Sequence, residues 1–276
     1  DLIFLHGGEA DQCTDGEQSI ANALFFTRLG QRVITGITTL TRAGKLYELD
    51  MRLRPSGNSG TLVTSVTAFL QYQRDEAWVW EHQALTRARV VVGDWALAES
   101  LQQEIRAILT QPREVETIRR EVAEMRARIF AEKKPDAGWR DIKQTRGGIV
   151  DIEFLVQFLM LAFAAQHPDI LRRNTANALR GCQQAGLLSR EAYAVLEEAY
   201  GFLRLVENRL RLLHGKSENR IGPSPVVREQ LRRLCDLPEG TDIVQVLDGY
   251  FISVLPIVQN YLEGSHPLLP SSSGVG

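Results

Sequence analysis

Charged residues whose spacing could support catalysis stand in the segment 47–57, YELDMRLRPSG. On a β-strand its four charged side chains would share one face, because successive side chains of a strand point to opposite sides. They are Glu48, Asp50, Arg52 and Arg54. Such a face is typical of the solvated side of an edge strand, and it would also suit a site for a metal ion and a phosphate. The pattern alone leaves both interpretations open and assigns no role to Glu48.

The second interpretation has a definite chemistry. Residues two apart on a strand are separated by about 6.6–6.8 Å, which suits a metal ion bound beside a phosphate chain. Mg²⁺ uses one or two carboxylates together with substrate phosphate oxygens, so Asp50 is a candidate ligand. Arg52 and Arg54 offer the planar donors that suit phosphate. A second carboxylate must come from a neighbouring strand, and Asp1 is the candidate because it stands at the edge of the apolar segment 2–5.

Weaker signals lie elsewhere in the chain. Gly147 and Gly148 precede an apolar helix and would either place its N–H groups near an anion or form a simple turn. Lys143 and Arg146 beside them fit either a phosphate contact or a solvated surface. The pair Glu81–His82 lies in a tryptophan-bearing helix, where a structural histidine is favoured over a general base. No nucleophile-elbow, zinc-protease or phosphate-loop motif is present.

The composition is that of one large globular domain or two smaller ones, with 276 residues, 44% of them hydrophobic and 24% charged. The formal net charge of -2 argues against a broad nucleic-acid-binding surface. Three distant cysteines form no CxxC pair, which predicts free thiols in a reducing compartment and a cytoplasmic protein. They are Cys13, Cys182 and Cys235.

Membrane association is not expected from the sequence. It begins with no signal peptide and holds no apolar run of roughly 18 residues or more. The nearest run, 149–165, is interrupted by Asp151, Glu153 and Gln157. We interpret it as a buried core helix.

The first part of the chain is predicted to mix strands and helices. Strands are expected at 2–5, 47–54 and 61–64, the second closed by Pro55-Ser56-Gly57. A helix is expected at 17–36 with Asp15 as its cap, and another from the cap Ser65 through Tyr72. The apolar residues expected to face inward on the first helix are Ile20, Leu24, Leu29 and Val33.

From residue 76 onward the periodicity predicts only helices. These are 76–92, 94–109 and 113–132, a break at 133–138, and then 149–165, 174–185, 190–213 and 243–262. Ser189 is the predicted cap of the long helix 190–213, and Gly215 is its predicted stop. The predicted fold class is α+β: a partial mixed sheet with trailing helices over 1–135, an all-α helical bundle over 136–266, and a disordered tail over 267–276.

Four blocks in order resemble the glutamine synthetase adenylyltransferase family of bacterial nitrogen control. They are DLIFLH, YELDMRLRPSG, EAWVWEHQALTRARVVVGD and DIKQTRGGIVDIEFLVQFLML. The likeness runs over residues 1–161 and more loosely through the later helices. The family has two similar nucleotidyltransferase halves, one that adds AMP to glutamine synthetase and one that removes it. The block EAWVWEHQALTRAR resembles the adding half, which is usually C-terminal.

The resemblance implies a metal site made of an Asp-x-Asp pair and a third Asp on a neighbouring strand. Asp1 matches the second member of the pair, Asp50 matches the third carboxylate, and both are then catalytic. Arg52 and Arg54 are the implied nucleotide contacts, and Lys143 is a further candidate from its place before Gly147 and Gly148. The first Asp and a Gly-rich turn for the triphosphate would precede Asp1. The chain is therefore expected to be N-terminally truncated and to bind metal weakly by itself.

The implied reaction transfers AMP from ATP, with Mg²⁺, to a tyrosine of glutamine synthetase. The implied partners are glutamine synthetase, ATP and, through the full-length enzyme, a PII-type signalling protein. Two alternatives remain: the adenylyl-removing half, which returns AMP to phosphate as ADP, and a non-catalytic helical interaction module. A nucleic-acid nucleotidyltransferase is disfavoured by the acidic balance, so neither nucleic acid nor a membrane is an expected partner.

Overall fold

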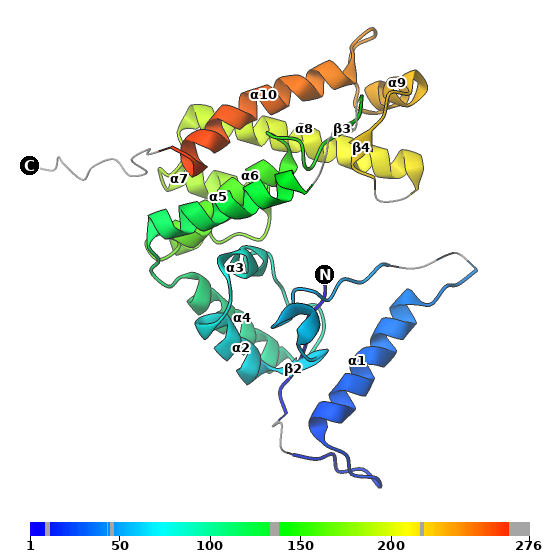
Figure 1. The fold of residues 1–276 in the computed structure, drawn as a ribbon, viewed down its shortest axis with the longest axis vertical. Helices are drawn as coiled ribbons and strands as arrows, with labels where there is room; N and C mark the ends of the chain where they lie inside the picture. The colour runs from blue at the N-terminus through cyan, green and yellow to red at the C-terminus, as the bar shows by residue number, and fades with distance from the viewer. Residues whose placement is uncertain (9–11, 43, 45–46, 133–137, 216–217, 265–276) are drawn as a thin grey trace, which may run out of the picture. The chain divides into compact units, whose positions relative to one another are not determined.

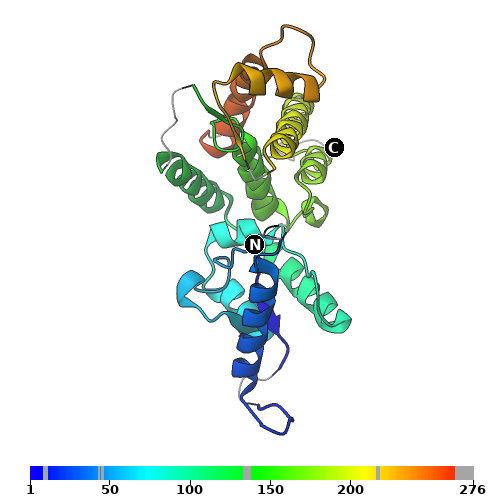
Figure 2. The same ribbon diagram turned by 90° about the vertical axis from the view of Figure 1, so that its right-hand side faces the viewer.

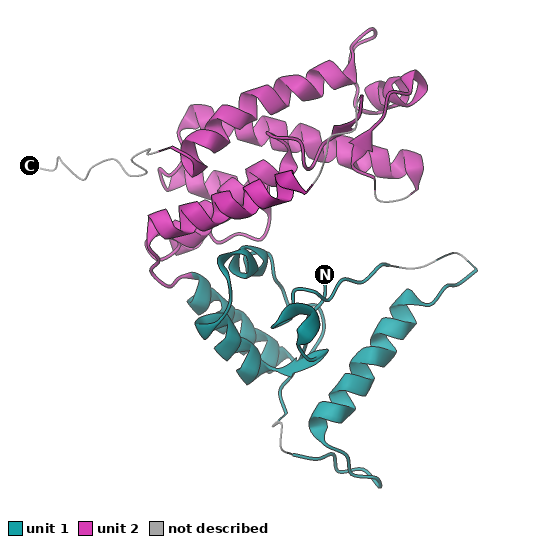
Figure 3. Cartoon of the chain, viewed as in Figure 1, with its two compact units in different colours: residues 1–109 teal, residues 110–276 magenta. Residues whose placement is uncertain are grey.

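The computed structural model describes residues 1–8, 12–42, 44, 47–132, 138–215 and 218–264. It divides the chain into two compact units, 1–109 and 110–276 (Figure 3). The helix that follows the boundary packs on two later helices, so it groups with the second unit. The predicted break at 133–138 lies, except for Gly138, outside the described residues, and so does the predicted tail at 267–276. The functional division into a catalytic part and a bundle part stays a prediction.

The first unit combines a two-stranded parallel sheet with helices (Figure 1). Ser65 ends the second strand and caps the helix that follows, because its hydroxyl accepts a hydrogen bond from the N–H of Ala68 at 3.2 Å, as the sequence predicts. Phe4 of one strand lies opposite Val63 of the other. The described elements are β1 Phe4–His6, α1 Asn22–Thr38, η1 Gly57–Ser59, β2 Val63–Ser65, α2 Val66–Asp75, α3 Val79–Leu85 and α4 Trp95–Leu109.

Helix α1 differs from its prediction both in the residue at which it begins and in the face that it buries. It begins after Ala21 with no side-chain cap, so the predicted cap Asp15 was wrong. Three residues predicted to face inward are exposed: Leu24 by 44%, Leu29 by 46% and Val33 by 39%.

The position of α1 that is buried is Gly30, where the helix meets β2. A Cβ added to Gly30 would lie 2.9 Å from Cγ2 of Val63, so the absent side chain is what permits the close approach. A glycine carries no apolar side chain, and periodicity therefore could not mark this face as the packed one.

The helix predicted over 76–92 is shorter than expected. Helix α3 ends at Leu85, after which Arg87 and Ala88 donate to carbonyls three residues back and form turns. The β-branched run 90–92 that follows loses side-chain freedom in a helix, which lowers its helix propensity. Helix α4, in contrast, follows its prediction closely, and Asp94 accepts a hydrogen bond from the N–H of Leu97 at 3.0 Å.

The second unit is a bundle of helices around α6 (Figure 1, Figure 2). Most of the 15 residues of α6 are buried, as predicted for a core helix, and α5, α7, α8 and α10 all pack against it. The described elements are α5 Val115–Ala131, β3 Arg140–Asp141, α6 Ile149–Phe163, η2 Pro168–Ile170, α7 Thr175–Gln184, α8 Arg190–His214, β4 Arg220–Ile221, α9 Pro225–Leu234 and α10 Ile243–Leu262.

The ends of the second unit's helices follow local capping signals. The Ser189 hydroxyl accepts from the N–H of Ala192 at 3.0 Å, and Gly215 ends α8 in a left-handed conformation with φ 61, as predicted. Helix α9 and the antiparallel pair of β3 with β4 were not predicted. A two-residue strand is too short for alternation to appear in a sequence.

Helix α10 is long and apolar enough to cross a membrane by length and composition alone, with a mean hydropathy of 1.3, although the sequence scan found no such run. A core helix passes the same test, and α10 packs against α5, α6, α8 and α9 through a stripe that includes Leu247, Phe251 and Val254. We therefore describe it as a core helix of the bundle.

Candidate functional site

The segment 47–54 does not form the predicted strand. At Asp50 the main chain does run beside the first residues, because the N–H of Leu2 donates to the Asp50 carbonyl at 2.8 Å. Beyond Met51 the chain turns, and the N–H of Arg54 donates back to the Met51 carbonyl at 3.4 Å. The predicted face of four charged side chains at strand spacing is therefore wrong.

The turn arises because Asp50 bonds to its own chain two residues on. Its carboxylate accepts from the backbone N–H of Arg52 at 2.9 Å, a local bond by which Asp favours turns over strands. The Arg52 guanidinium donates to the same carboxylate, Nε at 2.8 Å and Nη2 at 2.5 Å from Oδ2. The two groups are in direct contact, not separated by room for a metal ion.

This contact sets the protonation behaviour of Asp50. The hydrogen bonds from the Arg52 side chain, followed by the one from its backbone, lower the Asp50 pKa to about 2 from its ordinary 3.8. The Arg52 pKa is raised, chiefly by its hydrogen bonds to Asp50. Both side chains are partly exposed, 34% for Asp50 and 74% for Arg52, so solvent screens the pair.

Arg54 is committed to the turn. Its guanidinium donates from Nη1 to the Met51 carbonyl at 2.8 Å and from Nε to the Gly60 carbonyl at 3.3 Å. A third bond runs from Nη2 to the Asn58 carbonyl at 3.4 Å. Arg54 thus shapes the loop 51–60, a role that alternation in the sequence did not indicate.

Three of the predicted residues, Asp50, Arg52 and Arg54, nevertheless line one open cavity of about 430 Å³, whereas Asp1 and Lys143 are not among its lining residues. Carboxylates and guanidinium groups on one concave surface suit an anionic ligand that also brings a cation. The lining residues are Glu48, Leu49, Asp50, Met51, Arg52, Arg54 and Asn58.

A resident metal ion does not fit this surface. No group of three or more His, Cys, Asp or Glu side chains that could hold a metal occurs among the residues that the structure describes. Asp1 is exposed, and the N–H of the next residue, Leu2, donates to the Asp50 carbonyl. The amino terminus of Asp1 makes a small further contribution to the lowered pKa of the Asp50 carboxyl. One or two carboxylates do suffice for Mg²⁺ that is shared with substrate phosphates. The donor set thus fits a cation that arrives with a nucleotide.

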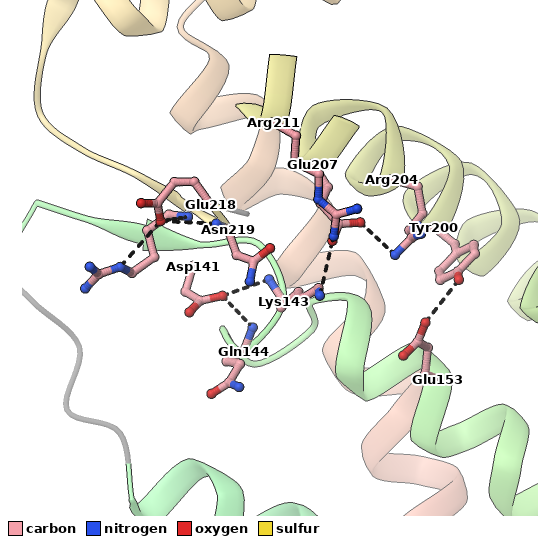
Figure 4. A network of polar contacts seen from close by, with 11 residues as sticks. Asp141, Lys143, Gln144, Glu153, Tyr200, Arg204, Glu207, Arg211, Glu218 and Asn219 are labelled. Atoms are coloured by element: carbon pink, nitrogen blue, oxygen red, sulfur yellow. Dashed lines mark hydrogen bonds and ion pairs between the residues drawn. The ribbon is translucent and has the colours of Figure 1, made fainter. Parts of the chain in front are cut away.

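Lys143 lies in the second unit, where it contacts a buried carboxylate (Figure 4). Its Nζ is 3.1 Å from Oε1 of Glu207, whose side chain is 0% exposed. Arg204 and Arg211 each approach the same carboxylate to 2.6 Å, from positions one turn of α8 away. Neutralisation of a buried charge accounts for Lys143 without a ligand. Its contact with a phosphate stays a prediction.

Gly147 and Gly148 form a turn. The N–H of Gly147 donates to Oδ2 of Asp151 at 2.7 Å, and the N–H of Gly148 donates to the Thr145 carbonyl at 2.7 Å. Since these N–H groups are used within the protein, the turn interpretation is favoured over the anion site. Arg146 lies over the ring of Phe130, 4.8 Å from its centroid.

Glu81 and His82 of α3 both form hydrogen bonds within the protein. His82 is 6% exposed and its Nε2 hydrogen-bonds with the Gln73 carbonyl at 2.8 Å, which accords with the structural interpretation. Glu81, to which the sequence assigned no role of its own, accepts from the Trp78 N–H at 2.9 Å and from the Tyr72 hydroxyl at 3.0 Å. The spacing from Trp78 to Glu81 is that of half a capping box, and this signal could have identified it.

Comparison with known proteins gives the same family as the motifs. Residues 1–105 match the family model described as glutamate-ammonia ligase adenylyltransferase, and residues 117–246 match the model described as PII-uridylyltransferase. The relatives below are named bifunctional glutamine synthetase adenylyltransferase/adenylyl-removing enzymes. One from Hahella chejuensis is 48% identical over 219 residues, and one from Pseudomonas aeruginosa is 44% identical over 226 residues. One from Xanthobacter autotrophicus is 39% identical over 268 residues.

These alignments cover most of this chain but a minor part of each relative. They include 77% of the chain for the first two relatives and 95% for the third, against 23%, 23% and 27% of the relatives. The chain thus spans about a quarter of the length of the curated relatives that it matches. The chain belongs to the glutamine synthetase adenylyltransferase/adenylyl-removing family.

Proposed function

We propose that the first unit is part of a nucleotidyltransferase site that transfers AMP from ATP to a tyrosine of glutamine synthetase. The observation that supports this proposal most directly is the open cavity lined by Asp50, Arg52 and Arg54. All three residues lie in the part of the chain that matches the adenylyltransferase family model. The bond from the tyrosine oxygen to the α-phosphorus forms while the bond to the bridging oxygen breaks. Pyrophosphate leaves, and the tyrosine proton passes to water.

The chain's own contribution to this reaction is charge. Arg52 is 74% exposed and its side chain is free to leave Asp50 for the phosphates, where it would stabilise the charge that develops on the leaving group. Asp50 with a pKa of about 2 is a weak base, so we assign it a role in charge and metal binding and not in proton removal.

Mg²⁺ would enter this site with ATP. When bound, it would neutralise phosphate charge, held by Asp50 and, in the proposed arrangement, by Asp1. Arg52 must release the Asp50 carboxylate for this to happen. Arg52 would therefore exchange the Asp50 carboxylate for the phosphates, and this exchange would free Asp50 for the metal ion.

The helical second unit is proposed to help dock the protein substrate, which needs a patch and not a narrow pocket. Its match to the PII-uridylyltransferase model supports, as a proposal, a PII-type signalling protein as a partner of the whole enzyme. Lys143 keeps its proposed nucleotide contact only if it leaves Glu207. A cytoplasmic location fits the three cysteines, all of which are free.

The test is Asp50→Asn in the longest natural chain that carries these residues. We expect AMP transfer to fall by at least about a hundredfold, because a charged ligand is lost from the reacting centre. The thermal midpoint should stay close to that of the wild type, because the pair is screened by solvent. Retained transfer would contradict the role of Asp50, and no heat on titration of ATP with Mg²⁺ into the wild type would favour the non-catalytic module.

The adenylyl-removing half is the second candidate, since the relatives are named as bifunctional. The block that contains Trp78 and Glu81 resembles the adding half, and this supports AMP transfer. Assaying Asp50→Asn in both directions separates the two. Loss of AMP addition with removal retained supports the first candidate, and the reverse result supports the second.

A further inference from the structure

Two arginines flank a buried carboxylate on α8 (Figure 4). Glu207 is 0% exposed, and Arg204 approaches its Oε2 to 2.6 Å while Arg211 approaches its Oε1 to 2.6 Å. Residues three and four apart on a helix are neighbours on one face, so the two arginines reach Glu207 from opposite ends of that face. The Nζ of Lys143 meets the same carboxylate at 3.1 Å. Three cations thus meet one anion.

This group of four residues carries a surplus of positive charge. Lys143 alone would neutralise Glu207, so the charges of both arginines are in excess. Like charges that meet at one carboxylate repel one another, and the repulsion is stronger beside a buried region than in water. Two positive charges therefore remain uncompensated where the arginine side chains reach the surface of α8.

Two other carboxylates near the group have partners of their own. Asp141 accepts hydrogen bonds from the N–H groups of Lys143 and Gln144, both at 2.9 Å. Glu153 accepts from the Tyr200 hydroxyl at 3.1 Å. In the part of the chain that the structure describes, the cations of the group form their ion pairs with the buried carboxylate. The surplus charge is therefore left for a group from outside the chain.

Both arginines keep donors that Glu207 does not use. A guanidinium has five N–H groups, and Arg204 turns Nη1 to the carboxylate while Arg211 turns Nη2. Their side chains are 35% and 41% exposed, so a ligand has access to them. The Nε of Arg211 is buried and has no hydrogen-bond partner among the described residues. The hydrogen bonding of this guanidinium is thus incomplete within the chain.

We propose that Arg204 and Arg211 form a binding site for a phosphate-type dianion, and that Glu207 and Lys143 hold the two guanidinium groups together. Two negative charges would balance the two surplus positive ones. Phosphate suits the site because its oxygens accept paired hydrogen bonds from a planar guanidinium. Since the two guanidinium groups already meet the two oxygens of one carboxylate, one phosphate group can contact both. The site lies in the second unit and does not rest on the proposed function.

The test is calorimetric titration of inorganic phosphate into the 276-residue chain at constant ionic strength. The wild type should bind phosphate saturably, and Arg204→Gln and Arg211→Gln should each raise its Kd about tenfold, because each removes charge-assisted hydrogen bonds. Both variants should fold, since Glu207 keeps two of its three cations, and thermal unfolding checks this. Arg211→Lys keeps the charge without the planar fork, so it should raise the Kd by less than Arg211→Gln does.

The matched control is Arg180→Gln. Arg180 of α7 is also a partly exposed arginine beside a carboxylate, with Nη2 at 3.4 Å from Glu197. It should leave the Kd for phosphate unchanged. The proposal is overturned if the wild type shows no saturable binding, if Arg204→Gln and Arg211→Gln bind phosphate as tightly as the wild type, or if the control weakens binding as much as they do.

Free phosphate and the phosphate of a nucleotide share this chemistry, and competition separates them. Displacement of phosphate by AMP or ATP identifies a nucleotide as the ligand, and phosphate that stays bound in their presence identifies the free ion. Either result upholds the site. An oligoglutamate peptide that binds where phosphate does not would overturn it in favour of an acidic protein partner. If the wild type binds no ATP, the proposed function fails, while the phosphate titration still decides this site.

Discussion

At the scale of single residues, the pairing of Asp50 with Arg52 is the feature that the site depends on. An aspartate and an arginine two apart would point the same way on a strand, and here they bond to each other within one turn. A carboxylate engaged by three donors is not available to a cation. In the proposed site, Arg52 would therefore have to move before Asp50 could hold a metal ion.

The first prediction at this scale concerns the Asp50 pKa. Arg52→Ala removes the largest cause of its depression, so the pKa should rise from about 2 toward 3.8. The stabilisation from the pair is present above pH 3.8 and is lost as pH falls through about 2. Carboxyl-carbon NMR titration measures the change, with Arg32→Ala on α1 as an exposed control. A pKa that stays near 2 in Arg52→Ala would mean that the backbone N–H alone holds it.

At the scale of elements, buried charge fastens α5 to α6. Arg126 is 2% exposed and Asp151 is 0% exposed, and Nε and Nη2 of the arginine meet the two carboxylate oxygens at 2.6 and 2.7 Å. Asp151 also accepts from the Gly147 N–H, so one side chain fixes both the helix pair and the turn that starts α6. Arg126 reaches on to Glu263 at 2.8 Å.

Asp151→Asn should therefore destabilise the protein by about 3–5 kcal/mol, because a buried guanidinium loses its buried counter-charge and keeps only the partly exposed Glu263. The control is Asp248→Asn, whose partner Arg140 is 35% exposed, and it should cost no more than about 1 kcal/mol. Urea unfolding gives both values. Equal losses of unfolding free energy in the two variants would contradict the claim that burial makes the Arg126–Asp151 pair more important than the exposed pair.

The turn before α6 makes the second prediction at this scale. Gly147 has φ +83, and a Cβ there would lie 2.2 Å from the Phe251 carbonyl of α10. Gly147→Ala should destabilise the protein by at least about 2 kcal/mol, from strain and overlap together. Gly186→Ala has a similar φ of +75 with no atom within 4 Å, and it should cost only about 1 kcal/mol. Thermal unfolding of the two variants separates strain from overlap.

At the scale of the whole molecule, the two units differ in how they are packed. The second unit surrounds α6 on several sides, and residues such as Ile152, Leu155 and Leu159 are 0% exposed. The first unit has a sheet of two short strands, and much of α1 is exposed. Since buried apolar area is the main favourable term in folding, the second unit has the stronger basis for independent stability.

A chain of residues 110–264 alone should thus fold as one cooperative unit. We expect a helical circular-dichroism spectrum and a single thermal transition, because the core around α6 lies entirely within this range. A gradual, non-cooperative melt of this chain would contradict the prediction.

The sequence by itself determined the helices of the second unit other than α9, and the family of the chain. Ser65, Ser189 and Gly215 act on residues three or four positions away, so their effect can be read from neighbours in the sequence. The apolar composition of α6 likewise predicts that this helix is buried.

Only the tertiary structure decided the conformation of the site and the partners of the buried charges. Alternation in 47–54 is compatible with a strand or with local pairing, and the outcome depends on whether a neighbouring strand supplies hydrogen bonds. The contacts of Lys143 with Glu207 and of Arg126 with Asp151 join residues far apart in the sequence. Such contacts follow from how helices pack, and local periodicity carries no information about their partners.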